Sequence, residues 1–205
     1  MVWRGIPSAP TVRVVRTPGD WSSYALLRLR RWGARPPVVS PPQHLLHLYS
    51  DDEGLLDRLE AWVLAGRDRG QRTVVFATPE RREALRTRLA LWSLEDAVDM
   101  HDAQAALDRF VVDGAPDPVR FESVIGSAVR AYPPGQVRAY GEMVAVLWRE
   151  GNVQGALELE ELWNALQRTV DCPLLCAYPD ADLRTADGDH PMRASVCGAH
   201  DHLLR

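Results

Sequence analysis

Short apolar runs alternate along the chain with longer stretches of helical periodicity, beginning at His44. The runs HLLHLY at 44–49, TVVFA within 71–78 and PLLCAY at 173–178 are typical of strands buried on both faces. Shorter strands are expected at 97–100 and 136–139. The predicted helices span 53–65, 79–92, 102–110, 118–131, 140–150 and 152–169. This alternation indicates βαβ units, and therefore an α/β domain with a mainly parallel central sheet flanked by helices.

Capping residues support several of these boundaries. Ser50 or Asp51 can cap the first predicted helix, Gly66 is a natural stop for it, and Asn152 can cap the last long helix. Residues 179–192 are polar and rich in turn formers, and we expect residues 192–204 to form a short amphipathic ending.

The first part of the chain differs from the rest because many prolines interrupt it and an arginine cluster lies at 28–35. Such a composition is more typical of a loose extension than of a core element, although residues 11–16 have the pattern of an edge strand. We therefore expect an N-terminal extension at 1–41 and one α/β domain at 42–205.

Charge and cysteine content exclude several classes of partner. A net charge of −4 gives no field that would attract nucleic acid or an anionic membrane. No run approaches the ~18 apolar residues of a membrane span. The three cysteines are an odd number, which argues against a disulfide framework and favours free thiols. We expect a cytoplasmic protein that binds neither nucleic acid nor membrane.

The chain contains no lysine, so neither a Schiff-base lysine nor the lysine of a phosphate-binding loop can exist in it. The first strand-to-helix turn, where nucleotide-binding α/β proteins place a glycine-rich loop, instead carries Asp51, Asp52 and Glu53. These carboxylates would repel a phosphate. An ATPase or kinase activity is therefore not expected.

Two cysteine-containing pairs resemble zinc ligands, Cys172 with Cys176 and Cys197 with His200. If the first pair lies in an extended strand, its members are about 13 Å apart, which is too far for one metal ion unless Cys172 lies in a bend. Cys176 with His44 or His200 would be a candidate nucleophilic pair. However, burial in an apolar strand raises the pKa of a thiol and so makes it a poorer nucleophile. We expect no metal, no other cofactor and no catalysis.

A polar group of residues stands out in the last third of the chain. Glu160, Trp163 and Asn164 share one helical face, while Arg138 and Glu142 flank a predicted strand-to-helix junction. A carboxylate, an amide and an indole N–H together make a small hydrogen-bonding surface. The simpler interpretation of the same residues is a surface ion pair and a core tryptophan.

Longer motifs give this region a family resemblance. The passage VRAYGEMVAVLWREGNVQGALELEELWNALQ, followed by PLLCAYP, resembles the MEDS domain, the sensory domain of methanogens, methylotrophs and regulators of the DcmR type. The opening HLLHLYSDDEG and the segment FVVDGAPDPVRFE are similar to other parts of that domain. The resemblance covers about residues 42–178.

The resemblance implies a RecA/KaiC-like three-layer fold without a functional phosphate-binding loop. It also implies a domain that senses a small molecule, such as a simple hydrocarbon derivative, and acts on a partner histidine kinase or transcription regulator. The alternatives are a ligand-free interaction module that regulates a kinase or sigma-type factor, and a residual nucleotide binder. The residues that the resemblance assigns to ligand binding are His44, Arg138, Glu142, Glu160, Trp163, Asn164 and Cys176. We expect the polar members to converge on one concave site, with Trp163 as an apolar wall.

Overall fold

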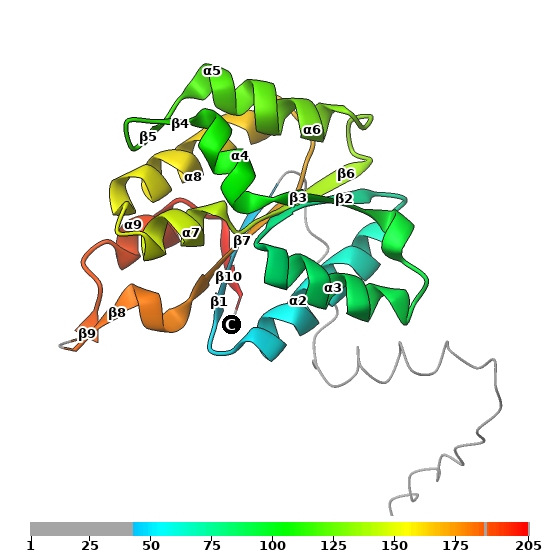
Figure 1. The fold of residues 1–205 in the computed structure, drawn as a ribbon, viewed down its shortest axis with the longest axis horizontal. Coiled ribbons are helices and arrows are strands. Elements are labelled where there is room, and N and C mark those ends of the chain that lie inside the picture. The colour runs from blue at the N-terminus through cyan, green and yellow to red at the C-terminus, as the bar shows by residue number, and fades with distance from the viewer. Residues whose placement is uncertain (1–42, 187, 205) are drawn as a thin grey trace, which may run out of the picture. The chain divides into compact units, whose positions relative to one another are not determined.

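A six-stranded sheet forms the middle layer of the computed structural model, which describes residues 43–186 and 188–204 (Figure 1). The strand order is β10-β1-β7-β6-β2-β3, and every pairing between neighbours is parallel. The strands are β1 (His44–Tyr49), β2 (Arg72–Ala77), β3 (Val98–Asp102), β6 (Val137–Gly141), β7 (Leu174–Pro179) and β10 (His202–Leu204). The predicted α/β class and mainly parallel sheet are confirmed, and the architecture is consistent with a RecA-like fold.

Helices cover both faces of the sheet (Figure 1). One face is covered by α2 (Asp52–Arg67) and α3 (Pro79–Ala90), whose apolar residues share a core with the sheet. A second core lies on the opposite face. The helical elements that contribute to it are α4 (Ala103–Phe110), α5 (Pro118–Phe121), η2 (Glu122–Gly126), α6 (Ser127–Arg130), α7 (Met143–Arg149), α8 (Val153–Gln167), η3 (Asp180–Leu183) and α9 (Arg193–Gly198). The remaining short elements are η1 (Glu95–Ala97), β4 (Val111–Val112), β5 (Ala115–Pro116), β8 (Arg184–Thr185) and β9 (Gly188–Asp189).

Alternation along each strand decides which core a side chain enters. Leu46 and Cys176 are register partners and both belong to the core under α8, whereas the next pair, Leu45 and Leu175, belongs to the core under α2 and α3. The same rule applies to the polar residues of these strands, so it divides the candidate site residues between the two faces.

The polar residues Glu160 and Asn164 lie on helix α8, whose first residue and apolar stripe are both well defined. Asn152 accepts a hydrogen bond from the backbone N–H of Gly155 at 2.9 Å and so caps the helix. A stripe of apolar side chains then packs onto the sheet. Its members are Ala156, Leu159, Trp163 and Leu166. Glu160 and Asn164 follow Leu159 and Trp163 directly, so both face the sheet at the edge of this stripe.

Two predicted boundaries are wrong for physical reasons. Gly66 does not end the first helix, which continues to Arg67; the left-handed turn residue is Gly70, with φ of 71°. Tyr140 belongs to β6 and not to the following helix, because its backbone continues the ladder with β2 and its ring is fully buried.

The C-terminal segment also differs from the expected amphipathic ending. After α9 the chain forms β10, which pairs in parallel with β1 through Leu45 and His202. The helix expected at 118–131 is present, but it contains the π-helical turn η2. No helix of the described ranges is long and apolar enough to cross a membrane. The N-terminal extension, the edge strand at 11–16 and the boundary at 42 lie outside the described residues.

Candidate functional site

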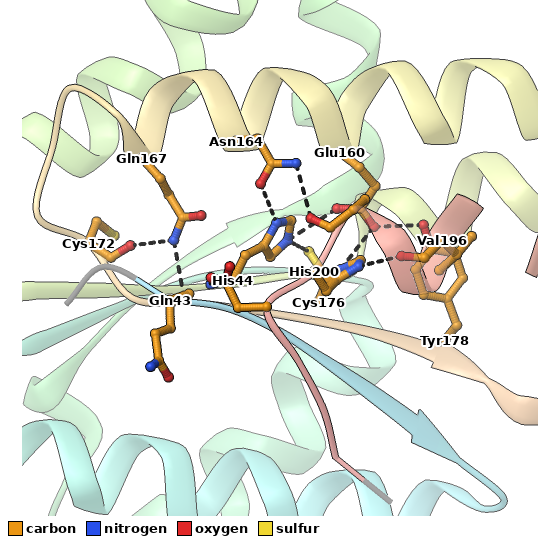
Figure 2. A network of polar contacts seen from close by, with 12 residues as sticks. Gln43, His44, Glu160, Asn164, Gln167, Cys172, Cys176, Tyr178, Val196 and His200 are labelled. Atoms are coloured by element: carbon orange, nitrogen blue, oxygen red, sulfur yellow. Dashed lines mark hydrogen bonds and ion pairs between the residues drawn. The ribbon is translucent and has the colours of Figure 1, made fainter. Parts of the chain in front are cut away.

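A buried cluster of polar side chains lies between α8 and the strands β1 and β7 (Figure 2). His44 is the first residue of β1, and Cys176 lies in the middle of β7. Glu160 and Asn164 reach down from α8, and His200 enters from the segment between α9 and β10. The cluster therefore joins four parts of the chain that are far apart in sequence.

The four groups that could ligate a metal are in close contact. Nε2 of His44 lies 3.3 Å from Sγ of Cys176 and 3.2 Å from Oε2 of Glu160. Nε2 of His200 lies 3.5 Å from Oε1 of the same carboxylate. One ligand atom from each of the four residues can be chosen so that all lie within 4.8 Å of one another.

Hydrogen bonds to oxygen atoms fix the orientation of both imidazole rings. Asn164 donates from Nδ2 to the carbonyl of Ala199, so its Oδ1 accepts from Nδ1 of His44 at 2.9 Å. Nδ1 of His200 donates to the carbonyl of Val196 at 2.7 Å. Because a carbonyl oxygen can only accept, both rings carry a hydrogen on Nδ1 and turn Nε2 toward Glu160.

The Glu160 carboxylate is charged although it is completely buried. Burial alone would raise its pKa, but the nearby His200, the hydrogen bond and charge of His44, and a hydrogen bond from the Tyr178 hydroxyl at 2.8 Å lower it to about 2. The pKa of His44 is raised overall. Burial alone would lower it, but the hydrogen bond and charge of Glu160 outweigh burial.

The other two members of the cluster are held in their neutral forms. Burial lowers the pKa of His200 more than Glu160 raises it. Burial raises the pKa of the Cys176 thiol well above its ordinary value, and the neighbouring carboxylate raises it further. Cys176 is thus a protonated thiol without the character of a nucleophile.

The structure brings together His44, Glu160, Asn164 and Cys176, but it places Arg138 on the opposite face of the sheet. Arg138 donates to Oε1 of Gln71 and to the carbonyl of Trp62, and its guanidinium lies 4.2 Å from the centre of the Trp62 ring. Burial, with a smaller effect of Arg69, lowers its pKa to about 10. The expectation that Arg138 joins the other residues is wrong, because strand alternation directs it toward α2.

Glu142 and Trp163 also lie apart from the cluster. Glu142 follows the end of β6, where Oε2 accepts from the backbone N–H of Thr78 and Oε1 lies 3.6 Å from both Arg81 and Arg149. Trp163 is a core residue whose ring makes edge contacts with Phe76 and Phe121. One concave site lined by all the predicted residues does not form, since their elements end at different edges and faces.

The sequence argument missed Tyr178 and did not include His200 among the ligand-binding residues. Tyr178 lies two residues after Cys176 on the same strand, so alternation places both side chains on one face and could have identified it. His200 lies in a short segment without a clear periodicity. Of the sequence-derived zinc candidates, only Cys176 and His200 belong to the cluster.

A surface hollow of about 430 Å³ opens beside the cluster. Its lining residues are Glu161, Asn164, Gln167, Arg168 and Asp201. Two of them reach the cluster directly: Asn164 holds the His44 ring, and Oδ2 of Asp201 accepts from the backbone N–H of His44 at 2.7 Å. The hollow and the buried cluster therefore share residues.

Comparison with known proteins gives a family match over most of the chain. The family model described as MEDS, the MEthanogen/methylotroph, DcmR Sensory domain, matches residues 43–198. No curated protein matches the chain. The match includes β1, α8 and β7, which carry most of the cluster. The chain belongs to the MEDS family of sensory domains.

Proposed function

We propose that this domain binds a small oxygenated organic molecule in the hollow beside His44 and passes the signal to a partner regulator. The observation that carries the proposal is the shared lining, because Asn164 and Asp201 border the hollow and also contact His44. Membership of a sensory family supports the same function.

The chemistry of the lining favours a polar ligand over a bare hydrocarbon. The hollow offers two carboxylates, one guanidinium and two amides. Its volume of about 430 Å³ is in the range of small-molecule sites. A short alcohol or carboxylic acid could use Arg168 as a hydrogen-bond donor and Asn164 or Gln167 as either partner, while a halomethane would leave these groups unpaired.

The signal would travel through the segment that follows α9. Asp201 is tied to β1 twice, by its side chain to the N–H of His44 and by its own N–H to the carbonyl of His44 at 2.8 Å. A ligand that competes for Asp201 or Asn164 would loosen or shift β10 at the edge of the sheet. An exposed edge strand can pair with another chain, so its displacement would be the output toward a partner histidine kinase or transcription regulator.

A ligand-free interaction module is less well supported. The large apolar side chains that are exposed in the described ranges are Leu91, Val112, Val119 and Leu203, and they come from different parts of the fold. Scattered apolar residues of this kind do not form a docking patch.

The chemistry of Cys176 and of the start of α2 favours a sensing role without catalysis. The Cys176 thiol is protonated and enclosed, and the start of α2 is capped by the carboxylate of Asp51 in place of a phosphate. Neither position supplies a reactive group to a bound substrate.

A thermal-shift screen of the full chain tests the proposal. The panel contains short alcohols, short carboxylic acids, halomethanes and nucleotides, and we expect one oxygenated class to raise the melting temperature in a saturable way. Arg168→Ala should reduce that shift, whereas Arg120→Ala, an exposed arginine on α5 outside the hollow, should keep it. A panel without any shift, or a shift that is equal in Arg168→Ala, contradicts the proposal.

A further inference from the structure

We propose that His44, Glu160, Cys176 and His200 form a tetrahedral zinc site. The inference does not depend on ligand sensing, because it rests only on the geometry and chemistry of these four buried side chains. It also replaces the sequence-derived expectation of no metal, which considered a different set of four residues.

The donor set is the first argument. Two imidazole nitrogens, one thiolate and one carboxylate are the ligand types that zinc takes in proteins. With Zn²⁺, one thiolate and one carboxylate, the site has no net charge, which suits side chains that are at most 2% exposed at His44, Glu160 and His200. Binding releases the thiol proton of Cys176 and any proton held on Nε2 of His44.

Distances give the second argument. A tetrahedron with metal–ligand bonds of about 2.0–2.3 Å has edges of about 3.3–3.7 Å. The contacts of His44 Nε2 with Cys176 Sγ and Glu160 Oε2, at 3.3 and 3.2 Å, are already near that length. The separation of His200 Nε2 from Glu160 Oε1 is 3.5 Å, and the whole set of four ligand atoms lies within 4.8 Å. The widest separation in the set, up to 4.8 Å, must shorten by about 1 Å to reach the length of an edge.

The orientation of the histidines is the third argument. Their Nδ1 atoms are engaged by Asn164 Oδ1 and the Val196 carbonyl, and Figure 2 shows both rings turned with Nε2 toward the carboxylate. A metal-bound histidine commonly has its second nitrogen held in this way by an outer oxygen. Tyr178 donates to Oε1 of Glu160 and thereby leaves Oε2 for the metal.

Unsatisfied atoms give the fourth argument. Nε2 of His200 is among the buried side-chain atoms of the described residues that have no hydrogen-bond partner, and Oε2 of Glu160 has its ion-pair contact with His44 at 3.2 Å. Nε2 of neutral His200 is an acceptor, and it lies 3.5 Å from Oε1 of the same carboxylate. Two buried acceptors that face each other are unfavourable, and a cation between them satisfies both.

Cobalt substitution in the full chain tests the site directly. After treatment with a chelator, Co²⁺ should bind one per chain and give the visible bands of tetrahedral cobalt with a thiolate-to-cobalt charge-transfer band, and Zn²⁺ should displace it. Cys176→Ser should abolish the charge-transfer band. The matched controls Cys172→Ser and Cys197→Ser should retain it, since both thiols lie outside the cluster.

Two further variants separate ligation from a purely structural role. His200→Ala should weaken Co²⁺ binding at least tenfold. Asn164→Ala should weaken it about 10- to 100-fold through the loss of the outer hydrogen bond, with Gln154→Ala, an exposed position on the same helix, unchanged. Circular dichroism shows whether each variant is folded.

The proposal is overturned if the folded wild-type protein gives no charge-transfer band, whatever the variants do. It is equally overturned if the band persists in Cys176→Ser or disappears in Cys197→Ser.

Discussion

Oδ1 of Asn164 accepts a hydrogen bond from His44 Nδ1 at 2.9 Å, while Nδ2 of the same amide donates to the Ala199 carbonyl at 3.1 Å. One side chain on α8 thus holds both the first strand and the segment that leads into β10. Both bonds are partly shielded from water, so the groups they satisfy are costly to leave unpaired.

Asn164→Ala should therefore destabilise the metal-free protein by about 1–3 kcal/mol. The measurement is urea denaturation with a chelator present, together with hydrogen exchange. We expect the amides of β10 to exchange faster than those of β2, since the lost bond anchors the edge strand. Glu161→Ala should change stability by less than about 0.5 kcal/mol. Equal stability of Asn164→Ala and wild type would show that the amide is not a structural link.

Gly66 is the last residue but one of α2, and the side chain of Arg138 occupies the space beside it. A Cβ at Gly66 would lie 2.8 Å from Cδ and 2.9 Å from Nε of Arg138. Gly66→Ala should thus destabilise the domain, although alanine is about 1 kcal/mol better than glycine inside a helix.

The Arg138→Ala background supplies the control for this prediction. There, Gly66→Ala should be neutral or stabilising, and the difference between the two backgrounds should exceed about 1 kcal/mol in chemical denaturation. Additive effects of the two substitutions would refute a steric origin.

His47 should make stability depend on pH. Burial, and to a smaller degree Arg58, lower its pKa from 6.5 to about 4. The unfolded chain therefore binds this proton more readily than the folded one, and the stability contributed by neutral His47 is complete above pH 6.5 and lost as pH falls toward 4. The loss by pH 5 is about 2 kcal/mol.

Comparison with His47→Gln isolates this effect from that of other histidines. The variant should lose less stability than wild type between pH 7.5 and pH 5, measured by denaturation at each pH. His202→Gln, an exposed position on β10, should follow wild type. A parallel pH profile of wild type and His47→Gln would contradict the pKa shift.

The domain should not hydrolyse ATP. The backbone N–H of Gly54 donates to Oδ1 of Asp51 at 2.7 Å, so a carboxylate already occupies the start of α2. The first turn of this helix also carries Asp52 and Glu53. Phosphate release with Mg²⁺ and ATP should not exceed that of heat-denatured protein, and measurable turnover that co-purifies with the folded chain would refute the prediction.

The local pattern of apolar residues was sufficient to predict most strands of the sheet. The apolar runs of β1, β2 and β7 are continuous because both of their faces are buried, and each is bordered by turn or capping residues. The three-residue β10 has no comparable pattern. Its pairing partner, Leu45, lies 157 residues before His202, so only the tertiary structure reveals the strand.

The candidate site was predictable only in part. Glu160 and Asn164 share a helical face and were placed together correctly with His44 and Cys176. Arg138 was misplaced because the predicted strand ended at Ala139. With Tyr140 included in β6, alternation puts Arg138 and Tyr140 on the same face, away from α8. His200 could not be assigned, since its contacts depend on where β10 pairs.

The strand order has a consequence for the synthesis of the chain. Strand β1 pairs only with β7 and β10 within the described sheet, and its first partner residue, Leu174, follows His44 by 174 − 44 = 130 residues. At about 5–20 residues per second, a ribosome needs roughly 7–26 s to make that stretch. During this interval the hydrogen-bonding edges of the apolar HLLHLY segment have no partner strand, although β2, β3 and β6 can associate with one another once they have been made. The nascent domain is thus exposed to aggregation and to chaperones at its first strand until its last strands emerge.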